Sequence, residues 1–171
     1  MKTLVILAHP DLASSRINAR LADAVRDLPD VTVHDLVAAY PDGRLDVERE
    51  QQLLREHDRI VWQFPWYWYS VPAVLKAWID QVFTAGFAYA GASELQGKVL
   101  QVVTSTGGPE AAYSEEGYHQ TTLHDLAAPL RATARLTGLE FATPLVLFGA
   151  RTATDEDLEL HAKRYREVLG G

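Results

Sequence analysis

The sequence predicts an α/β domain in which five parallel strands form a doubly wound sheet, in the order 2-1-3-4-5, with helices on both faces. Two observations lead to this fold class. Short apolar segments alternate with segments of helical periodicity along the chain, and the first apolar segment is continuous, as is typical of a strand buried on both faces. The length of 171 residues, without repeats or linkers, indicates one domain over residues 1–171.

The expected elements follow in strand–helix alternation. The run TLVILAHP at 3–10 predicts the first strand. Apolar residues then recur every three or four positions from Ile17 to Leu28, which predicts a helix that Pro29 ends. The remaining expected elements are a strand at 31–37, a charged helix at 46–58, a strand at 59–65, a helix from about 72 to 83, a strand within 98–109, a helix at 121–138 that Pro129 kinks and Gly138 caps, a strand at 141–150, and a last helix at 155–171 that Thr154 caps.

Composition excludes several classes of protein. The chain has no cysteine, which excludes disulfides, thiolate catalysis and cysteine-held iron–sulfur clusters, so redox chemistry would need a bound electron carrier. The net charge is −7 and no basic stripe is present, which argues against a nucleic-acid partner. No apolar run approaches 18 residues and no metal-binding motif such as HExxH occurs. We expect a cytoplasmic globular protein without a metal site.

In such a sheet, ligands bind beyond the carboxyl ends of the strands, at the switch point between strands 1 and 3. Three loops should converge there: the first loop (residues 8–18), the second loop (63–72) and the third loop (104–113). The first loop leads into a helix N-terminus, which favours an anion. Its hydrogen-bonding or charged side chains are His9, Ser14, Ser15, Arg16 and Asn18. The alternative is that the serines only cap the helix and His9 is a turn residue.

The second and third loops differ sharply in bulk. The second loop carries Phe64 and the run from Trp66 to Tyr69, which suits an apolar ring system, with backbone N–H groups along Trp66–Trp68 for its polar edge; the alternatives are a dimer interface or core. In the third loop, Gly107 and Gly108 allow close approach of a ligand, and Thr104, Ser105 and Thr106 supply hydroxyls. Tyr113 and His119 follow as candidates for proton handling.

A phosphate cradle, an aromatic wall and a thin glycine wall together describe a flavin mononucleotide site. The segments AHPDLASSRIN, FPWYWYSVPAVLKAWIDQVF, GFAY and STGGPEAAYSEEGYH resemble those of the flavodoxin-like NAD(P)H:quinone oxidoreductases. The similarity is closest to the short bacterial ancillary subunit of glutathione-regulated potassium efflux, and it extends over nearly the whole chain. It implies a flavodoxin-like fold.

The resemblance also implies residue roles. It places the flavin phosphate at the first loop, the ring system along the second loop, the other flavin edge at Thr106–Gly108, and stabilisation of the reduced flavin at Tyr113 and His119. The expected catalytic residues are therefore Tyr113 and His119. The expected cofactor-binding residues are His9, Ser15, Ile17, Asn18, Pro65, Trp66, Tyr67, Trp68, Ser105, Thr106, Gly107, Gly108 and Tyr113.

The implied activity is two-electron hydride transfer from NAD(P)H through bound FMN to a quinone, by a ping-pong sequence in a homodimer. FAD is a possible cofactor, but the chain has no obvious segment to hold an adenine, so FMN is favoured. Two alternatives stay open. One is an FMN electron carrier without a substrate of its own. The other is a regulatory flavoprotein subunit of a potassium/proton antiporter, peripheral at the inner face of the cell membrane. The preference for NADH or NADPH does not follow from the sequence.

Overall fold

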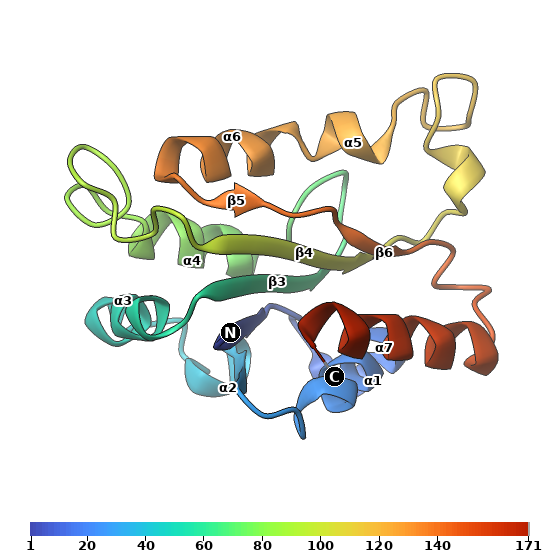
Figure 1. The fold of residues 1–171 in the computed structure, drawn as a ribbon. Helices are drawn as coiled ribbons and strands as arrows, with labels where there is room; N and C mark the ends of the chain where they lie inside the picture. Colours follow the sequence, from blue (N-terminus) through green and yellow to red (C-terminus); the bar gives the residue numbers. More distant parts are fainter. Residues whose placement is uncertain (171) are drawn as a thin grey trace.

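A central parallel sheet organises the structure, a computed structural model that describes residues 1–170 (Figure 1). The strand order β2-β1-β3-β4-β5 confirms the predicted topology, and a sixth strand, β6, pairs with β4 further along its length. The strands are β1 (Thr3–Leu7), β2 (Val31–Asp35), β3 (Arg59–Pro65), β4 (Val99–Ser105), β5 (Glu140–Phe141) and β6 (Leu145–Leu147).

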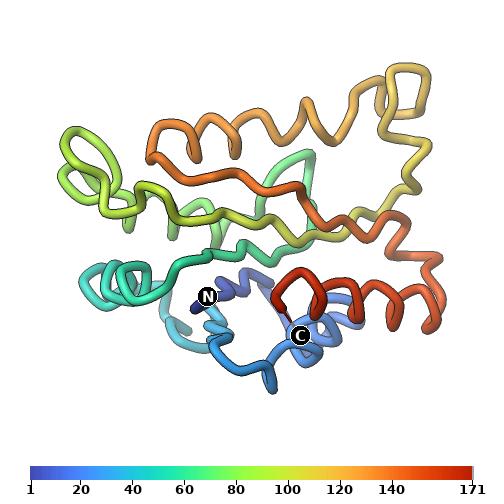
Figure 2. Tube along the Cα trace, in the orientation of Figure 1, coloured from blue at the N-terminus to red at the C-terminus, as the bar shows by residue number. Residues whose placement is uncertain are grey.

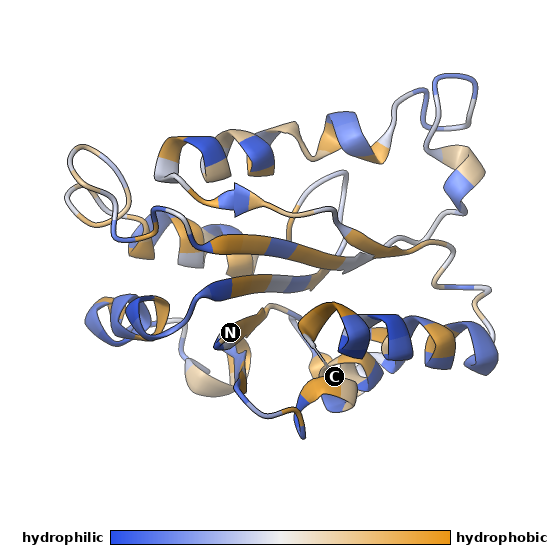
Figure 3. Ribbon diagram, in the orientation of Figure 1, coloured by the Kyte–Doolittle hydropathy of each residue, from blue (hydrophilic) through white to orange (hydrophobic). Residues whose placement is uncertain are grey.

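Helices cover both faces of the sheet because its central strands are apolar on both sides (Figure 3). In β1, Leu4 and Ile6 point into one core and Val5 into the other. The first core packs against α2 (Leu36–Ala39), α3 (Val47–Glu56), α4 (Ala73–Val82), α5 (Leu123–Leu126) and α6 (Ala128–Thr137). The second packs against α1 (Arg16–Val25) and α7 (Asp155–Leu169).

The two helices of the second face lie side by side although they are far apart in the sequence (Figure 2). Arg20 of α1 makes a two-pronged ion pair with Glu159 of α7, with both N···O distances 2.6 Å. The N-terminus of each helix is capped as the sequence predicts: Ser15 accepts the N–H of Asn18, and Thr154 forms a capping box with Asp157. Gly171, the end of the predicted last helix, lies outside the described residues.

Three predicted elements need correction. The second strand ends at Asp35 instead of residue 37, because the Asp35 carboxylate caps α2 by accepting the N–H groups of Val37 and Ala38. The predicted helix at 121–138 is two helices that break at Ala127, and Pro129 starts α6 where a missing N–H costs nothing. The predicted strand at 141–150 is two short strands, β5 and β6, with Pro144 between them.

Other expectations about chain ends and breaks hold. Gly138 takes the left-handed conformation at φ 74° and closes α6, as predicted. β1 and β4 end at Leu7 and Ser105, so the rest of each predicted run belongs to the first and third loops. Within residues 1–170 no helix combines the length and the apolar character needed to cross a bilayer.

Candidate active site

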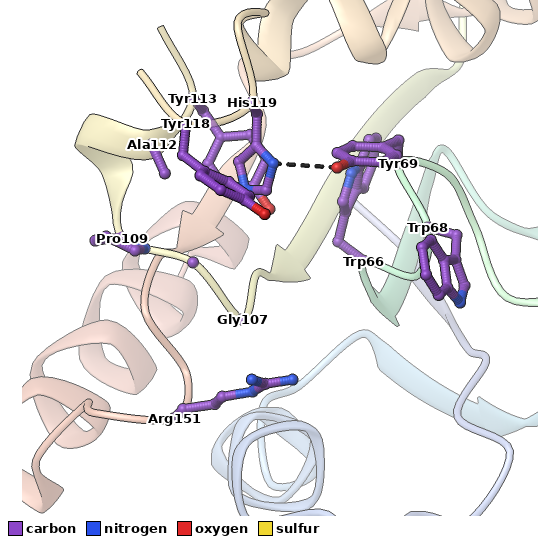
Figure 4. A pocket seen from close by; sticks show the side chains of 11 residues that line it. Trp66, Trp68, Tyr69, Gly107, Pro109, Ala112, Tyr113, Tyr118, His119 and Arg151 are labelled. Atoms are coloured by element: carbon purple, nitrogen blue, oxygen red, sulfur yellow. Dashed lines mark hydrogen bonds between the residues drawn. The ribbon is translucent and has the colours of Figure 1, made fainter.

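The carboxyl ends of β1, β3 and β4 bring the three predicted loops to one edge of the sheet. The N–H of Ala8 donates to the Gln63 carbonyl at 2.9 Å, and the N–H of Trp66 donates to the Ser105 carbonyl at 2.9 Å, so neighbouring loops are joined at their roots. A cavity of about 510 Å³ opens between the second loop and the segment that follows β4 (Figure 4). Its lining residues are Trp66, Trp68, Tyr69, Gly107, Gly108, Pro109, Ala112, Tyr113, Tyr118, His119 and Arg151.

The first loop lies beside this cavity without lining it. His9 is 8% exposed, and its Nδ1 accepts the N–H of Asp11 at 3.1 Å. Burial lowers the pKa of His9 despite the nearby carboxylate of Asp11, so the ring is neutral at neutral pH and has Nε2–H left to donate. Ser15 caps α1, whereas Ser14 donates its hydroxyl to the Asp11 carbonyl.

The first turn of α1 contains a buried polar side chain without a partner in the described part of the chain. Ile17 and Asn18 are buried, and Oδ1 of Asn18 has no partner among residues 1–170 although the residue is only 2% exposed. Rotation of the amide exchanges its donor and acceptor ends, so this side chain can offer either. Arg16 departs from expectation: its guanidinium donates to the Ala153 carbonyl and to Asp155, which directs it away from the loop.

The second loop divides its aromatic residues between core and surface. Phe64 and Trp66 are buried and stack with ring centroids 5.9 Å apart. Beyond them the chain turns tightly between Tyr67 and Ser70, whose N–H groups and carbonyls bond reciprocally. Trp68 and Tyr69 take left-handed backbone conformations at φ 46° and 63°, which is unusual for bulky residues and typical of a functional loop.

This turn changes which backbone groups can meet a ligand. The N–H groups along Trp66–Trp68 were expected to be available to a ligand, but those of Trp66 and Tyr67 bond to the Ser105 and Ser70 carbonyls. The N–H of Trp68 makes no backbone bond within the described residues. Trp68 is 92% exposed, so its side chain presents a large apolar surface to solvent.

The third loop is held by hydrogen bonds within itself and to β6. Thr106 is fully buried, and its N–H donates a hydrogen bond to the Leu147 carbonyl. Its hydroxyl donates to the Gly108 carbonyl at 2.9 Å, so this hydroxyl is already engaged within the protein. Space at Gly108 is tight: a Cβ there would lie 3.2 Å from Nε2 of His119, so the imidazole would have to shift slightly. At Gly107, a Cβ would come within 3.6 Å of Nε of Arg151.

Tyr113 and His119 lie together in the cavity wall, as Figure 4 shows, and a Cβ at Gly108 would come within 3.5 Å of both side chains. Their ring centroids are 4.4 Å apart, and Nδ1 of His119 lies 3.2 Å from the Tyr69 hydroxyl. The segment between them folds back tightly, with the N–H of His119 on the Ala112 carbonyl; a Cβ at Gly117 would lie 2.4 Å from the Ala111 carbonyl oxygen. Burial raises the pKa of Tyr113, so its phenol stays protonated and can donate at neutral pH.

Five residues of the cavity wall are not among the predicted site residues: Tyr69, Pro109, Ala112, Tyr118 and Arg151. Tyr69 belongs to the aromatic run that was recognised, and Tyr118 precedes His119, against which it packs edge-on at 5.2 Å. Arg151 carries no sequence signature, because only tertiary folding brings the segment after β6 to Gly107. Pro65, Tyr67 and Ser105 are near the cavity in the chain but do not line it.

Comparison with known proteins identifies the fold family of this chain and similar proteins. A family model described as a flavodoxin-like fold matches residues 1–169. An uncharacterized NAD(P)H oxidoreductase, YdeQ of Bacillus subtilis, is 46% identical over 96% of this chain and 84% of its own length. A glutathione-regulated potassium-efflux system ancillary protein, KefG of Cronobacter sakazakii, is 43% identical over 98% of this chain and 92% of its own length.

Solved structures agree in fold and differ in the activity they are named for. General stress protein 14 of Treponema denticola, in complex with FMN, has a TM-score of 0.94 at 37% identity and covers 99% of this chain and 98% of its own. An NADPH-quinone reductase from P. pentosaceus has a TM-score of 0.90 at 35% identity, covering 98% and 97%. A thermophilic tryptophan halogenase from Streptomycin violaceusniger has a TM-score of 0.94 at 39% identity, covering 99% and 98%. Because one fold supports several chemistries, the residues of the site must decide between them.

Proposed function

This chain belongs to the flavodoxin-like fold family, and on that premise we propose that it is an FMN-dependent NAD(P)H oxidoreductase that reduces a quinone. The observation that carries the proposal is the cavity of about 510 Å³ with an aromatic wall on one side and the Gly107–Gly108 wall on the other. The names of relatives support it: an NAD(P)H oxidoreductase, an NADPH-quinone reductase and an FMN complex are among them.

The residues present suit a flavin. A flat ring system suits the space between the indole of Trp68 and the wall where Gly108 lacks a Cβ. A phosphate suits the start of α1, where backbone N–H groups, the buried amide of Asn18 and Nε2–H of His9 are available. Bound FMN would supply the two-electron redox chemistry, since the chain has no cysteine or other redox group of its own.

The overall reaction would convert NAD(P)H, a proton and a quinone into NAD(P)⁺ and a quinol. Tyr113 would donate a hydrogen bond from its protonated phenol to the site where negative charge develops. His119, oriented by the Tyr69 hydroxyl, would hold the proton that the quinol requires or pass one from solvent. The aromatic side chains would exclude water from the reacting groups. With one cavity for both substrates, the kinetics would be ping-pong.

The test combines cofactor identification with turnover. We expect the purified protein to be yellow, to release FMN on heating, and to oxidise NAD(P)H only when a quinone is supplied. Initial rates at several fixed quinone concentrations should give parallel double-reciprocal lines. Release of FAD in place of FMN would correct the cofactor. A preparation that binds neither flavin, and consumes no NAD(P)H with any quinone, would refute the enzyme assignment.

A second function is favoured by the KefG similarity and is compatible with the first. We propose that the protein also associates with a potassium efflux antiporter as an ancillary subunit. Co-expression with a tagged antiporter encoded in the same genome should then retain this protein on membranes. Recovery only in the supernatant, at low and moderate salt, would leave the oxidoreductase activity as its sole proposed role. NAD(P)H turnover also separates the enzyme from a carrier that only shuttles electrons.

A further inference from the structure

The segment between β6 and α7 is attached to two of the site-forming loops at once. The N–H of Gly149 donates to the Gly108 carbonyl, and the N–H of Ala150 donates to the Thr106 carbonyl, both at 2.8 Å. At the other end of this segment, Arg16, the first residue of α1, donates to the Ala153 carbonyl at 2.9 Å. Residues 149–153 therefore bridge the third loop and the N-terminus of α1.

Arg151 lies in the middle of this bridge. Its side chain contributes to the cavity wall, and its Nε would lie 3.6 Å from a Cβ at Gly107 (Figure 4). Tight turns fix the backbone on either side, because the N–H groups of Thr152 and Ala153 both bond to the Gly149 carbonyl and Gly149 has φ 68°. The guanidinium is thus held by a constrained backbone in the cavity wall beside Gly107, and the Ala153 carbonyl two residues further on contacts the start of α1.

Three arginines in this part of the molecule are paired with carboxylates, whereas within residues 1–170 Arg151 and Arg164 of α7 form no ion pair. Arg16, Arg20 and Arg166 all reach across between α1 and α7 or its N-terminal approach, and each is paired with a carboxylate, of Asp155, Glu159 and Asp27 respectively. Within residues 1–170, Arg151 has no ion pair and its guanidinium donates no hydrogen bond. A second group without a partner lies in the first turn of α1, which Arg16 connects to this bridge: the 2%-exposed amide of Asn18 has an unpartnered Oδ1 among residues 1–170.

We propose that Arg151 binds a phosphate group in this crevice, opposite the N-terminus of α1. Arginine suits that task because its planar fork donates two parallel hydrogen bonds to phosphate oxygens and stays charged at all relevant pH values. The helix N-terminus adds backbone N–H groups and the positive end of its dipole on the facing side. The inference rests on the proposed function, which supplies two phosphate-bearing ligands: the flavin and the nicotinamide dinucleotide.

Its position favours the flavin phosphate. The bond from Arg16 to Ala153 fixes the bridge directly against the first turn of α1, which is the predicted phosphate cradle. A phosphate held there would lie between Arg151 and the first loop, and would satisfy both the unpaired guanidinium and the unpaired amide of Asn18.

The experiment compares ligands that differ only by a phosphate. Flavin-free protein, checked for its fold by circular dichroism, is titrated with FMN and with riboflavin, following the quenching of flavin fluorescence. Arg151→Gln should weaken FMN binding on the order of 10- to 100-fold, the range expected for a charge-assisted contact, and leave riboflavin unchanged. Arg151→Lys should restore part of the loss. Arg26→Gln is the matched control, because it removes the same charge from the far end of α1, where Arg26 pairs only with Asp23.

The second arm measures the apparent affinity for NADPH and NADH. If Arg151→Gln leaves FMN binding intact but selectively weakens NADPH, Arg151 binds a phosphate of the nicotinamide substrate, and the shared chemistry stands. The proposal is overturned if Arg151→Gln changes neither the affinity for FMN relative to riboflavin nor the affinity for NADPH relative to NADH. It is also overturned if Arg26→Gln has the same effect as Arg151→Gln, which would indicate an effect of net charge alone. A wild-type protein that binds no flavin would instead refute the proposed function.

Discussion

The hydroxyl of Tyr69 lies 3.2 Å from Nδ1 of His119, and this contact gives the two ring nitrogens of His119 different surroundings. Nδ1 faces the second loop, whereas Nε2 faces the wall where Gly108 lacks a side chain. The pair joins two loops that are 50 residues apart in the sequence. An imidazole fixed in this way can exchange a proton with one partner at Nδ1 while presenting Nε2 to a ligand.

Substitutions at the cavity should therefore slow reduction without loss of the flavin. For Tyr113→Phe and His119→Ala we expect flavin reduction by NAD(P)H to fall, on the order of 10²-fold for the lost donor, with flavin still bound because the first loop is untouched. Tyr69→Phe should give a smaller fall, since it removes only the group that orients His119. Stopped-flow absorbance of the flavin measures these rates.

Tyr89→Phe is the control for removal of a phenol, since Tyr89 is 41% exposed and does not line the cavity. It should reduce flavin at the wild-type rate. Wild-type rates in both Tyr113→Phe and His119→Ala would show that these two side chains only pack the loop, whatever the activity of the protein proves to be.

Acid should destabilise the protein through His161, a residue of α7 that is 6% exposed. Burial, with Arg164 adding to it, lowers the pKa of His161 to about 4. The unfolded chain keeps an ordinary pKa near 6.5, so the unfolded state binds the proton more tightly below that pH. The free energy of unfolding therefore keeps this contribution above about pH 6.5. As the pH falls from 6.5 towards 4, the free energy of unfolding decreases progressively, by up to about 3 kcal/mol.

Urea unfolding measured from pH 7.5 to pH 4.5 checks this expectation. His161→Leu replaces the titratable ring with an apolar side chain of similar size. It should flatten the pH dependence of the free energy of unfolding between pH 6.5 and pH 4.5. His124→Gln, on the exposed side of α5, should leave it unchanged. An acid dependence that is as steep in His161→Leu as in the wild type would mean that other groups cause it.

A buried carboxylate connects β2, α3 and α4 on the first face of the sheet. Glu50 of α3 is fully buried and accepts hydrogen bonds from Nε2 of His34 at 2.8 Å, the hydroxyl of Tyr40 at 2.6 Å and Nε1 of Trp78 at 2.7 Å. Burial alone would raise its pKa, but these bonds outweigh that effect and lower the pKa of Glu50, while burial and Glu50 raise the pKa of Tyr40 to about 12.

Removal of this carboxylate should be costly because it leaves three donors without an acceptor. We expect Glu50→Ala to lower the free energy of unfolding by about 3 kcal/mol or more, as read from the urea midpoint at constant slope. Glu48→Ala, on the exposed side of the same helix, should change it by less than about 0.5 kcal/mol. Near-equal effects of the two substitutions would contradict the role of the buried network.

The sequence predicted the sheet order and the three converging loops, because apolar runs and helical periodicity are local patterns that tertiary packing did not override in most elements. It did not predict the break at Ala127, where Pro129 fits the start of a helix as well as a kink. It also did not predict that the hydroxyl of Thr106 and the guanidinium of Arg16 are engaged within the protein. The Arg16 bonds reach residues 137 or more positions away, and the Thr106 bond depends on how its own loop turns, so no sequence spacing encodes either.

The exposed aromatic side chains around the cavity predict a homodimer. Trp68 is 92% exposed and Tyr118 is 88% exposed, and both line the same cavity. Large apolar surfaces gathered at one place usually mark an interaction site, and a second chain packed there would also close the cavity. Light scattering should give about twice the chain mass of 19.0 kDa.

Substitutions separate this surface from other exposed apolar residues. Trp68→Asp places a charge in the expected interface and should shift the protein towards a monomer, because burying an unpaired charge is unfavourable. Leu136→Asp alters a residue of α6 that is 69% exposed and lies outside the cavity, so it should leave the dimer intact. Since the second chain would complete the cavity wall, quinone reduction should fall together with dimer content as the Trp68→Asp protein is diluted. A wild-type protein that is fully active as a monomer at nanomolar concentration would contradict both the dimer and its contribution to the site.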